Sequence, residues 1–271
     1  MFYKYISIIT IMATVALAAG TPASAAVFLD QNVTNDVIFG SGNANGSFTV
    51  DRGNGIELGL RGKLRFNSSN LPENTFNSNG DGTYSFAAGL PPTGFGFAPG
   101  SPTTPIWNFE WSINSNFDGS GTNLDALTYQ IGIDFDAGVG TNFLIFDPVI
   151  TAGPGFADNA YGDNSTGNGA GTVPTTLTEA QNLANTKNLA QNSWNMEFFN
   201  NAPFDIFDPT VDGTYDFFIA AFDLTGLQLA RVDIAIIAGA GATKVVEPAT
   251  MGLFLIGLIG LGGLARRRNA A

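Results

Sequence analysis

The chain has 271 residues, with 23 acidic and 11 basic side chains, and it contains neither cysteine nor histidine. Without these two residue types, Ser-His-Asp and Cys-His nucleophilic sites are excluded, and so are nearly all zinc sites. Stabilisation by disulfides is excluded as well. The catalytic chemistry that remains is carboxylate chemistry, chiefly glycoside hydrolysis by an Asp/Glu pair.

The N-terminal segment, residues 1–25, has the three parts of a secretory signal peptide. Lys4 supplies a positive charge, residues 6–19 are mostly apolar, and Ala23-Ser24-Ala25 matches the small-x-small pattern of a cleavage site. We expect signal peptidase to cut after Ala25 or Ala26, which makes that enzyme a partner of the precursor. The alternative is an uncleaved N-terminal anchor.

The body of the chain, residues 26–244, is strongly acidic. It carries 22 acidic and seven basic residues, which gives a formal charge of −15. Such a charge repels nucleic acid and anionic lipid surfaces, so we expect no nucleic-acid partner. The same charge attracts cations. The body is also long enough to bury one sizeable core, and we expect it to form a single domain.

Short apolar runs in the body are separated by turns rich in Gly, Asn, Ser and Asp. The clearest run, residues 106–114, places Trp107, Phe109, Trp111 and Ile113 on one face, with Asn108, Glu110 and Ser112 on the other. This period of two predicts a strand that buries Trp107 and Trp111 in the core and leaves Glu110 outside. Further strands are predicted over residues 46–52, 55–66, 83–87, 127–135, 142–149, 194–199, 215–224 and 227–238.

One helix is predicted over residues 177–191, because Thr176 and Glu179 form a capping box ahead of a run of helix formers. Residues 91–105 and 158–172 are rich in Gly, with Pro or Asn, and are predicted to be irregular connections. About nine to eleven strands with one short helix and no βαβ alternation predict an all-β fold. Within that class we expect a jelly-roll-like β-sandwich.

The triplet Asp134-Phe135-Asp136 suggests a cation site. Side chains two residues apart in a strand share a face, so the two carboxylates repel each other unless a cation lies between them. Ca²⁺ suits all-oxygen sites in extracellular proteins. Asp134 and Asp136 are therefore candidate calcium ligands. The alternative is a solvated strand edge, where charges aid solubility and block edge pairing.

The segment Trp107-Asn108-Phe109-Glu110-Trp111 also raises the question of carbohydrate binding, because aromatic rings stack on sugars and a neighbouring carboxylate binds hydroxyls. The alternation favours core packing of the two tryptophans instead. A glycosidase would need a second carboxylate about 5–10 Å from Glu110. The acids Asp134, Asp136 and Glu197 are candidates only because of their residue type.

The C-terminal segment, residues 245–271, combines Glu247-Pro248, an uncharged stretch over 249–265, and the cluster Arg266, Arg267 and Arg268. A helix over the uncharged stretch is roughly 25 Å long, at the lower bound for crossing a bilayer core. Arginines beside a span stay on the cytoplasmic side. We therefore expect a transmembrane helix that leaves the body on the other side. A permanent single-span anchor is the alternative to a processed tail.

This order of elements resembles the PEP-CTERM proteins, exported proteins of Gram-negative bacteria that an exosortase processes. The matching residues are Glu247 and Pro248, the apolar residues 251–264 and the arginine cluster, whereas Val246 stands in place of the motif's first proline. Residues 190–195 and 213–218 also look like an uncharacterised group of such proteins. The resemblance implies no enzymatic activity.

The function that the resemblance implies is that of an exported cell-surface or extracellular-matrix protein. It passes transiently through the inner membrane to the periplasm, the cell surface or the matrix. Its expected partners are an exosortase-type membrane protease and exopolysaccharide. The sorting residues would be Ala25 for signal cleavage, Glu247 and Pro248 for processing, and residues 266–268 for topology. The alternative function is a calcium-dependent carbohydrate-binding module, followed by a carboxylate-based glycosidase.

Overall fold

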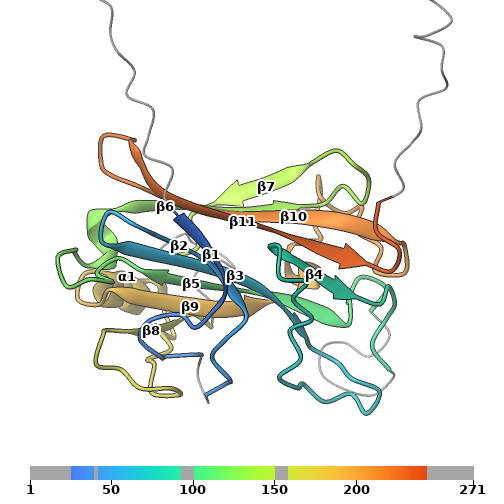
Figure 1. The fold of residues 1–271 in the computed structure, drawn as a ribbon, viewed down its shortest axis with the longest axis horizontal. Coiled ribbons are helices and arrows are strands. Elements are labelled where there is room, and N and C mark those ends of the chain that lie inside the picture. Colours follow the sequence, from blue (N-terminus) through green and yellow to red (C-terminus); the bar gives the residue numbers. More distant parts are fainter. Residues whose placement is uncertain (1–25, 40–41, 93–100, 150–157, 243–271) are drawn as a thin grey trace, which may run out of the picture.

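The computed structural model describes residues 26–39, 42–92, 101–149 and 158–242. These residues form two β-sheets, which lie one above the other, and one α-helix beside them (Figure 1). The fold is therefore all-β and sandwich-like, as the sequence predicts. The predicted signal peptide, residues 1–25, and the predicted sorting tail, residues 245–271, lie outside the described residues. Within the described ranges, no helix is long and apolar enough to cross a membrane.

The first sheet has six strands, each antiparallel to its neighbours. In spatial order they are β1 (Ala26–Gln31), β2 (Phe48–Gly53), β3 (Ile56–Leu64), β5 (Trp107–Asn114), β9 (Leu189–Trp194) and β8 (Ala160–Gly162). A two-residue turn joins β2 to β3. Its residues, Asn54 and Gly55, have φ angles of 53° and 77°. Positive φ at both positions is what a tight hairpin turn needs, which explains the Asn-Gly pair.

The second sheet has five strands. In spatial order they are β4 (Thr83–Phe86), β11 (Gln228–Ala238), β10 (Gly213–Phe222), β6 (Thr128–Asp134) and β7 (Phe143–Phe146). Strand β4 runs parallel to β11, and the other neighbours are antiparallel. The helix α1 spans Leu177–Ala184, and two short 3-10 helices span Leu124–Ala126 and Met196–Phe199.

The main core lies between the inner faces of the two sheets and is rich in aromatic side chains. Phe109 of β5 contacts Phe217 of β10 with ring centroids 4.6 Å apart. The ring centroids of Trp107 and Tyr215 lie 5.8 Å apart. Trp111 is fully buried. Burial of each large apolar side chain contributes about 1.5–3 kcal/mol, so these contacts hold the sheets together. The predicted placement of Trp107 and Trp111 in the core is confirmed.

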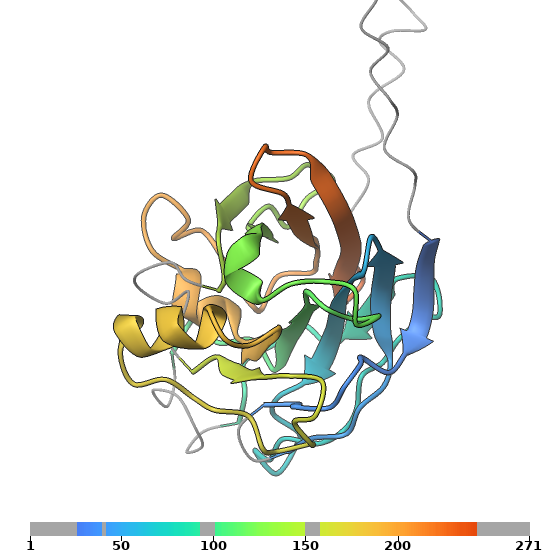
Figure 2. The ribbon, with the colours of Figure 1, turned by 90° about the vertical axis from the view of Figure 1, so that its left-hand side faces the viewer.

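A segment of the chain that connects β1 to β2 covers the outer face of the first sheet. We call residues 32–39 and 42–47 the covering segment; Figure 2 shows them running along the side of this sheet that faces away from the second sheet. Val33 and Ile38 of this segment pack against Phe48 and Val50 of β2 in a small second core. A Cβ at Gly59 would lie 2.8 Å from Val33 Cγ1, so the glycine allows this close approach.

Hydrogen bonds to Glu57 attach the start of the covering segment to β3. The Glu57 carboxylate accepts from the backbone N–H of Thr34 at 2.6 Å, from the Thr34 hydroxyl at 2.9 Å and from Arg52 Nε at 2.6 Å. Burial raises the pKa of Glu57, and the Thr34 and Arg52 donors oppose that rise. A carboxylate this buried is tolerated because three donors satisfy it.

Three predicted segments in the second half of the chain are wrong, and one strand near its start was not predicted. The Thr176 hydroxyl accepts the Glu179 N–H at 3.2 Å, as the capping box predicts, but α1 ends at Ala184. Residues 189–191, predicted to be helical, instead belong to β9, because β9 pairs with β5. The chain after Trp194 is a 3-10 turn, not a strand. The predicted connection over 158–172 contains the short strand β8, and β1 was not predicted at all.

Candidate functional site

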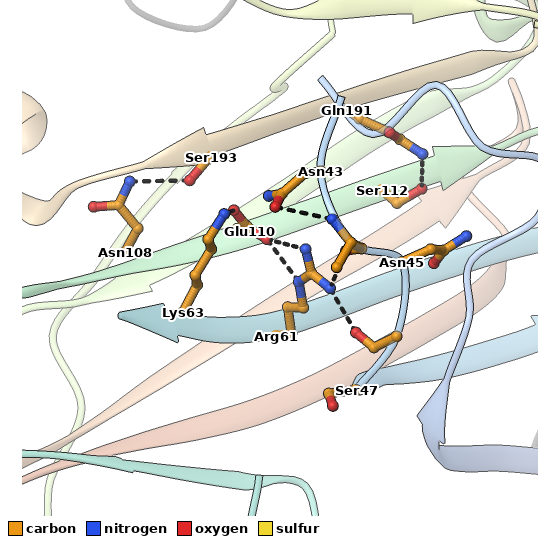
Figure 3. A network of polar contacts seen from close by, with 12 residues as sticks. Asn43, Asn45, Ser47, Arg61, Lys63, Asn108, Glu110, Ser112, Gln191 and Ser193 are labelled. Carbon is orange, nitrogen blue, oxygen red and sulfur yellow. Dashed lines mark hydrogen bonds and ion pairs between the residues drawn. The ribbon is translucent and has the colours of Figure 1, made fainter. Parts of the chain in front are cut away.

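The outer face of the first sheet carries a row of polar and charged side chains on β3, β5 and β9. The register places Arg61 opposite Glu110 and Lys63 opposite Asn108, and it places Glu110 opposite Ser193 on the other side. Residues directly opposite each other in an antiparallel pair share a face. Three strands therefore contribute to one polar surface, shown in Figure 3.

Arg61 and Glu110 form a buried ion pair at the centre of this surface. Arg61 Nε and Nη2 lie 2.6 Å and 2.5 Å from Glu110 Oε2, and the two side chains are 0% and 1% exposed. Arg61 Nη1 also donates to the backbone carbonyls of Ala44 at 3.1 Å and Gly46 at 2.6 Å. The prediction that Glu110 lies outside the protein interior is wrong, because its side chain is buried. Its face does point away from the main core, but the covering segment closes over it.

Aromatic rings enclose the Arg61 guanidinium from two elements. Its Cζ lies 4.2 Å from the centroid of Phe48 and 3.9 Å from that of Phe76. Cation–π contacts of this kind gain strength where water is excluded. Burial lowers the pKa of Arg61, and the Glu110 carboxylate opposes that shift. The guanidinium is thus fixed by a carboxylate, two carbonyls and two rings.

Lys63 and Arg65 continue the basic row beyond Arg61. Lys63 Nζ lies 3.7 Å from Glu110 Oε1. Burial lowers the pKa of Lys63, and the charges of Arg61 and Arg65 add to the effect while Glu110 opposes it. Burial also lowers the pKa of Arg65, and the negative charge of Glu110 opposes that shift. Glu110 is therefore the carboxylate that stabilises all three cations.

A groove of about 460 Å³ opens beside this basic row. Its charged lining residues are Lys63, Arg65, Glu73, Glu110 and Asp158. Its neutral polar lining includes Asn43, Asn74, Asn108 and Ser193, and Phe39 and Phe198 add aromatic rings. The groove therefore combines amides, a hydroxyl, charges of both signs and two rings.

Hydrogen bonds fix the polar floor of the groove. Asn108 Nδ2 donates to Ser193 Oγ at 2.9 Å, and Asn195 Nδ2 donates to Asn108 Oδ1 at 2.9 Å. One residue pair further along, Gln191 Nε2 donates to Ser112 Oγ at 3.0 Å (Figure 3). Side chains on neighbouring strands that are already bonded to each other lose little freedom when a ligand binds.

The carboxylates of Asp134 and Asp136, the candidate calcium ligands, accept backbone hydrogen bonds. Asp134 Oδ1 accepts the N–H groups of Asp136 at 3.0 Å and Asn142 at 2.6 Å, and Asp136 Oδ1 accepts that of Gly138 at 2.8 Å. Strand β6 ends at Asp134, so the alternation of faces does not extend to Asp136. Within the described ranges, no group of three or more acidic side chains is arranged to hold a metal ion. The calcium site stays a prediction.

The other candidate residues are not brought together in the described part of the chain. Glu110 lies on the outer face of the first sheet and Asp134 at the end of a strand of the second sheet. Glu197 accepts a hydrogen bond from the Thr104 hydroxyl at 2.5 Å. The predicted sorting residues lie outside the described residues: Ala25, Glu247, Pro248 and residues 266–268.

Sequence reasoning missed the basic row, although the signal is present. Arg61, Lys63 and Arg65 alternate with Gly62 and Leu64, and they account for three of the seven basic residues in an acidic body. A period of two within a predicted strand places all three on one face. What the sequence does not reveal is that Glu110, on a different predicted strand, pairs with this row.

Removing one partner of the buried pair should destabilise the fold strongly. Arg61→Met leaves the Glu110 carboxylate buried without its guanidinium, so we expect a loss of about 3–5 kcal/mol in the free energy of unfolding. The double variant Arg61→Met/Glu110→Leu should lose clearly less than the sum of the two single variants. Denaturant unfolding of all four proteins measures the coupling.

The exposed pair Arg231–Asp233 provides the matched control. Its side chains are 37% and 59% exposed and lie 2.6 Å apart. The corresponding cycle with Arg231→Met and Asp233→Leu should give a coupling of less than about 1 kcal/mol, because solvent screens the charges. Equal coupling energies for the two pairs would contradict the buried placement of Arg61 and Glu110.

Comparison with family models, with curated proteins and with solved structures finds no match for this chain. A function is therefore inferred from the groove, from the charges around it and from the sorting signals that the sequence predicts.

Proposed function

We propose that this protein is an exported, non-enzymatic component of the cell-surface or extracellular matrix, and that it associates there with exopolysaccharide. The support from the sequence is the pair of segments that bracket the body: the signal segment 1–25 and the tail 245–271. Both resemble sorting signals of exported proteins in Gram-negative bacteria. Signal peptidase acts at Ala25, and an exosortase-type protease acts near Glu247 and Pro248.

The sorting mechanism follows from the physics of the tail. The uncharged stretch, residues 249–265, halts translocation because apolar side chains favour the bilayer core. Arg266, Arg267 and Arg268 remain on the cytoplasmic side, since moving three charges across the core is costly. Glu247 and Pro248 are then presented at the outer face of the inner membrane, where the protease cuts and releases the body.

The observation that carries the binding role is the groove on the outer face of the first sheet. Its floor presents fixed amides and a hydroxyl, which match the hydroxyl groups of sugars, and Phe39 and Phe198 supply apolar surface for sugar rings. Polar groups held on a rigid sheet give the few well-placed hydrogen bonds that binding sites use. The groove therefore supports binding of a saccharide chain.

A binding role is favoured over glycoside hydrolysis by the state of Glu110. Hydrolysis uses two carboxylates about 5–10 Å apart, one of them available as an acid. Glu110 Oε2 is instead bound by two nitrogen atoms of Arg61. These two contacts occupy Oε2 and hold the carboxylate in place, which suits a structural role.

We also propose that the sandwich belongs to the jelly-roll-like class. The support is the antiparallel pairing within both sheets. Among the described strands, only β4 and β11 pair in parallel.

The processing step can be tested at Pro248. In cells that produce the natural matrix, Pro248→Ala should leave full-length tail in the inner membrane fraction, because the protease loses its rigid recognition element. Intact-mass measurement of the protein from membrane, surface and medium gives both ends of the chain. The neighbouring change Thr250→Ala is the control and should mature normally. Release of a Pro248→Ala protein with the wild-type mass would count against this role.

Binding at the groove can be tested by blocking it. Asn74 is exposed and lines the groove, so Asn74→Trp should fill part of it without disturbing the fold. We expect co-sedimentation with the cell's own exopolysaccharide to weaken about tenfold, equivalent to about 1.4 kcal/mol. Asn182→Trp, on the exposed side of α1, is the matched control. Wild-type binding by Asn74→Trp would show that the polysaccharide does not occupy the groove.

A further inference from the structure

Positive charge is concentrated at one place on an acidic protein. The body has a formal charge of −15, yet Arg61 and Lys63 share the outer face of the first sheet, and Arg65 follows directly after β3. Lys63 and Arg65 line the groove, and Arg61 lies buried next to them. A protein that binds only neutral sugars does not need cations at its groove, and burying them costs desolvation energy.

The two carboxylate oxygens of Glu110 differ in their contacts with this row. Glu110 Oε2 is bound by Arg61 at 2.5–2.6 Å, whereas Oε1 lies 3.7 Å from Lys63 Nζ. The second distance is too long for a hydrogen bond. Within the described residues, Glu110 Oε1 accepts no hydrogen bond, and its contact with Lys63 Nζ is the 3.7 Å ion pair. The Lys63 side chain is 10% exposed at the groove, so its ammonium group can reach an anion bound there.

The rest of the lining argues against a simple polyanion. Glu73 and Asp158 also line the groove and would repel closely spaced phosphates. Their carboxylates are acceptors that suit hydroxyl donors, and the amides Asn43 and Asn74 suit either partner. The ligand that fits therefore has isolated negative charges among many hydroxyl groups.

We propose, building on the proposed function, that the groove selects acidic polysaccharides, namely those whose sugars carry carboxylates. The carboxylate of a uronic acid unit accepts charge-assisted hydrogen bonds from Lys63 and Arg65. Neighbouring ring hydroxyls donate to Glu73 and Asp158 and bond to the asparagine amides. Glu110 acts as a positioning residue: it fixes Arg61 and holds the Lys63 ammonium at the edge of the groove.

The cell's own exopolysaccharide, before and after chemical reduction of its carboxylates to alcohols, provides the most direct test. The protein is produced from the full chain and purified as the cell matures it. We expect binding to weaken about 10- to 100-fold after reduction, the range for loss of hydrogen bonds to a charged group. Polygalacturonate and its methyl ester serve as defined probes, and we expect the acid to bind more tightly than the ester.

Variants of two lysines locate the effect. Lys63→Gln should weaken binding to polygalacturonate about tenfold or more and should reduce its dependence on salt. Lys187→Gln makes the same change of charge at a lysine that pairs with Asp163 at 2.6 Å, away from the groove, and should bind like wild type. Thermal unfolding confirms that each variant is folded. If Lys63→Gln does not fold, the comparison of acid and ester on the unchanged protein decides the question.

The outcomes separate this inference from the function on which it rests. Equal binding of the native and the reduced exopolysaccharide overturns the selection of carboxylates and leaves the proposed matrix role intact. No binding of the native exopolysaccharide overturns both. Binding of polyphosphate as tightly as polygalacturonate overturns the inference as well, because it would indicate a general anion site. Equal loss in the Lys63 and Lys187 variants would show that total charge, and not the groove, is responsible.

Discussion

The buried ion pair between Arg61 and Glu110 is the constraint on which the outer face of the first sheet depends. Two charges without exposure are tolerated only if each finds partners, and here the partners come from β3, β5 and the covering segment. The carbonyls of Ala44 and Gly46 fix the end of the covering segment, while Glu57 fixes its start through Thr34. The pair thus ties a long connection to the sheet and gives the sandwich a third layer.

This third layer explains how a groove with fixed walls forms on the face of a sheet. The covering segment buries one part of the polar row, and Lys63 and Asn108, which are almost fully buried, line the groove beside it. Hydrogen bonds along the floor hold the side chains in place before any ligand arrives. The same arrangement places Lys63 and Arg65 at the groove of an otherwise acidic body, and on this the proposed preference for acidic saccharides rests.

The sequence predicts those features that depend on local periodicity. The alternation around Trp107 and Trp111 identifies β5 and its buried face, and the Thr176 cap identifies the start of α1. Long-range effects are not visible in the pattern. Glu110 is buried because residues some 65 positions earlier fold over it. Residues 189–191 are not helical because they pair with β5 as part of β9. The groove was missed for the same reason, since its lining comes from segments far apart in the chain.

Solvent access to the outer face of the first sheet tests this account most directly. The chain has no cysteine, so Ser112→Cys introduces a single thiol, at a position that is 1% exposed under the covering segment. Ser68→Cys, on an exposed turn, is the matched control. In the native protein, alkylation of the thiol at 112 should be at least about 100-fold slower than at 68, because it requires local opening. Equal rates would show that this face is open to water and would contradict the burial of Arg61 and Glu110.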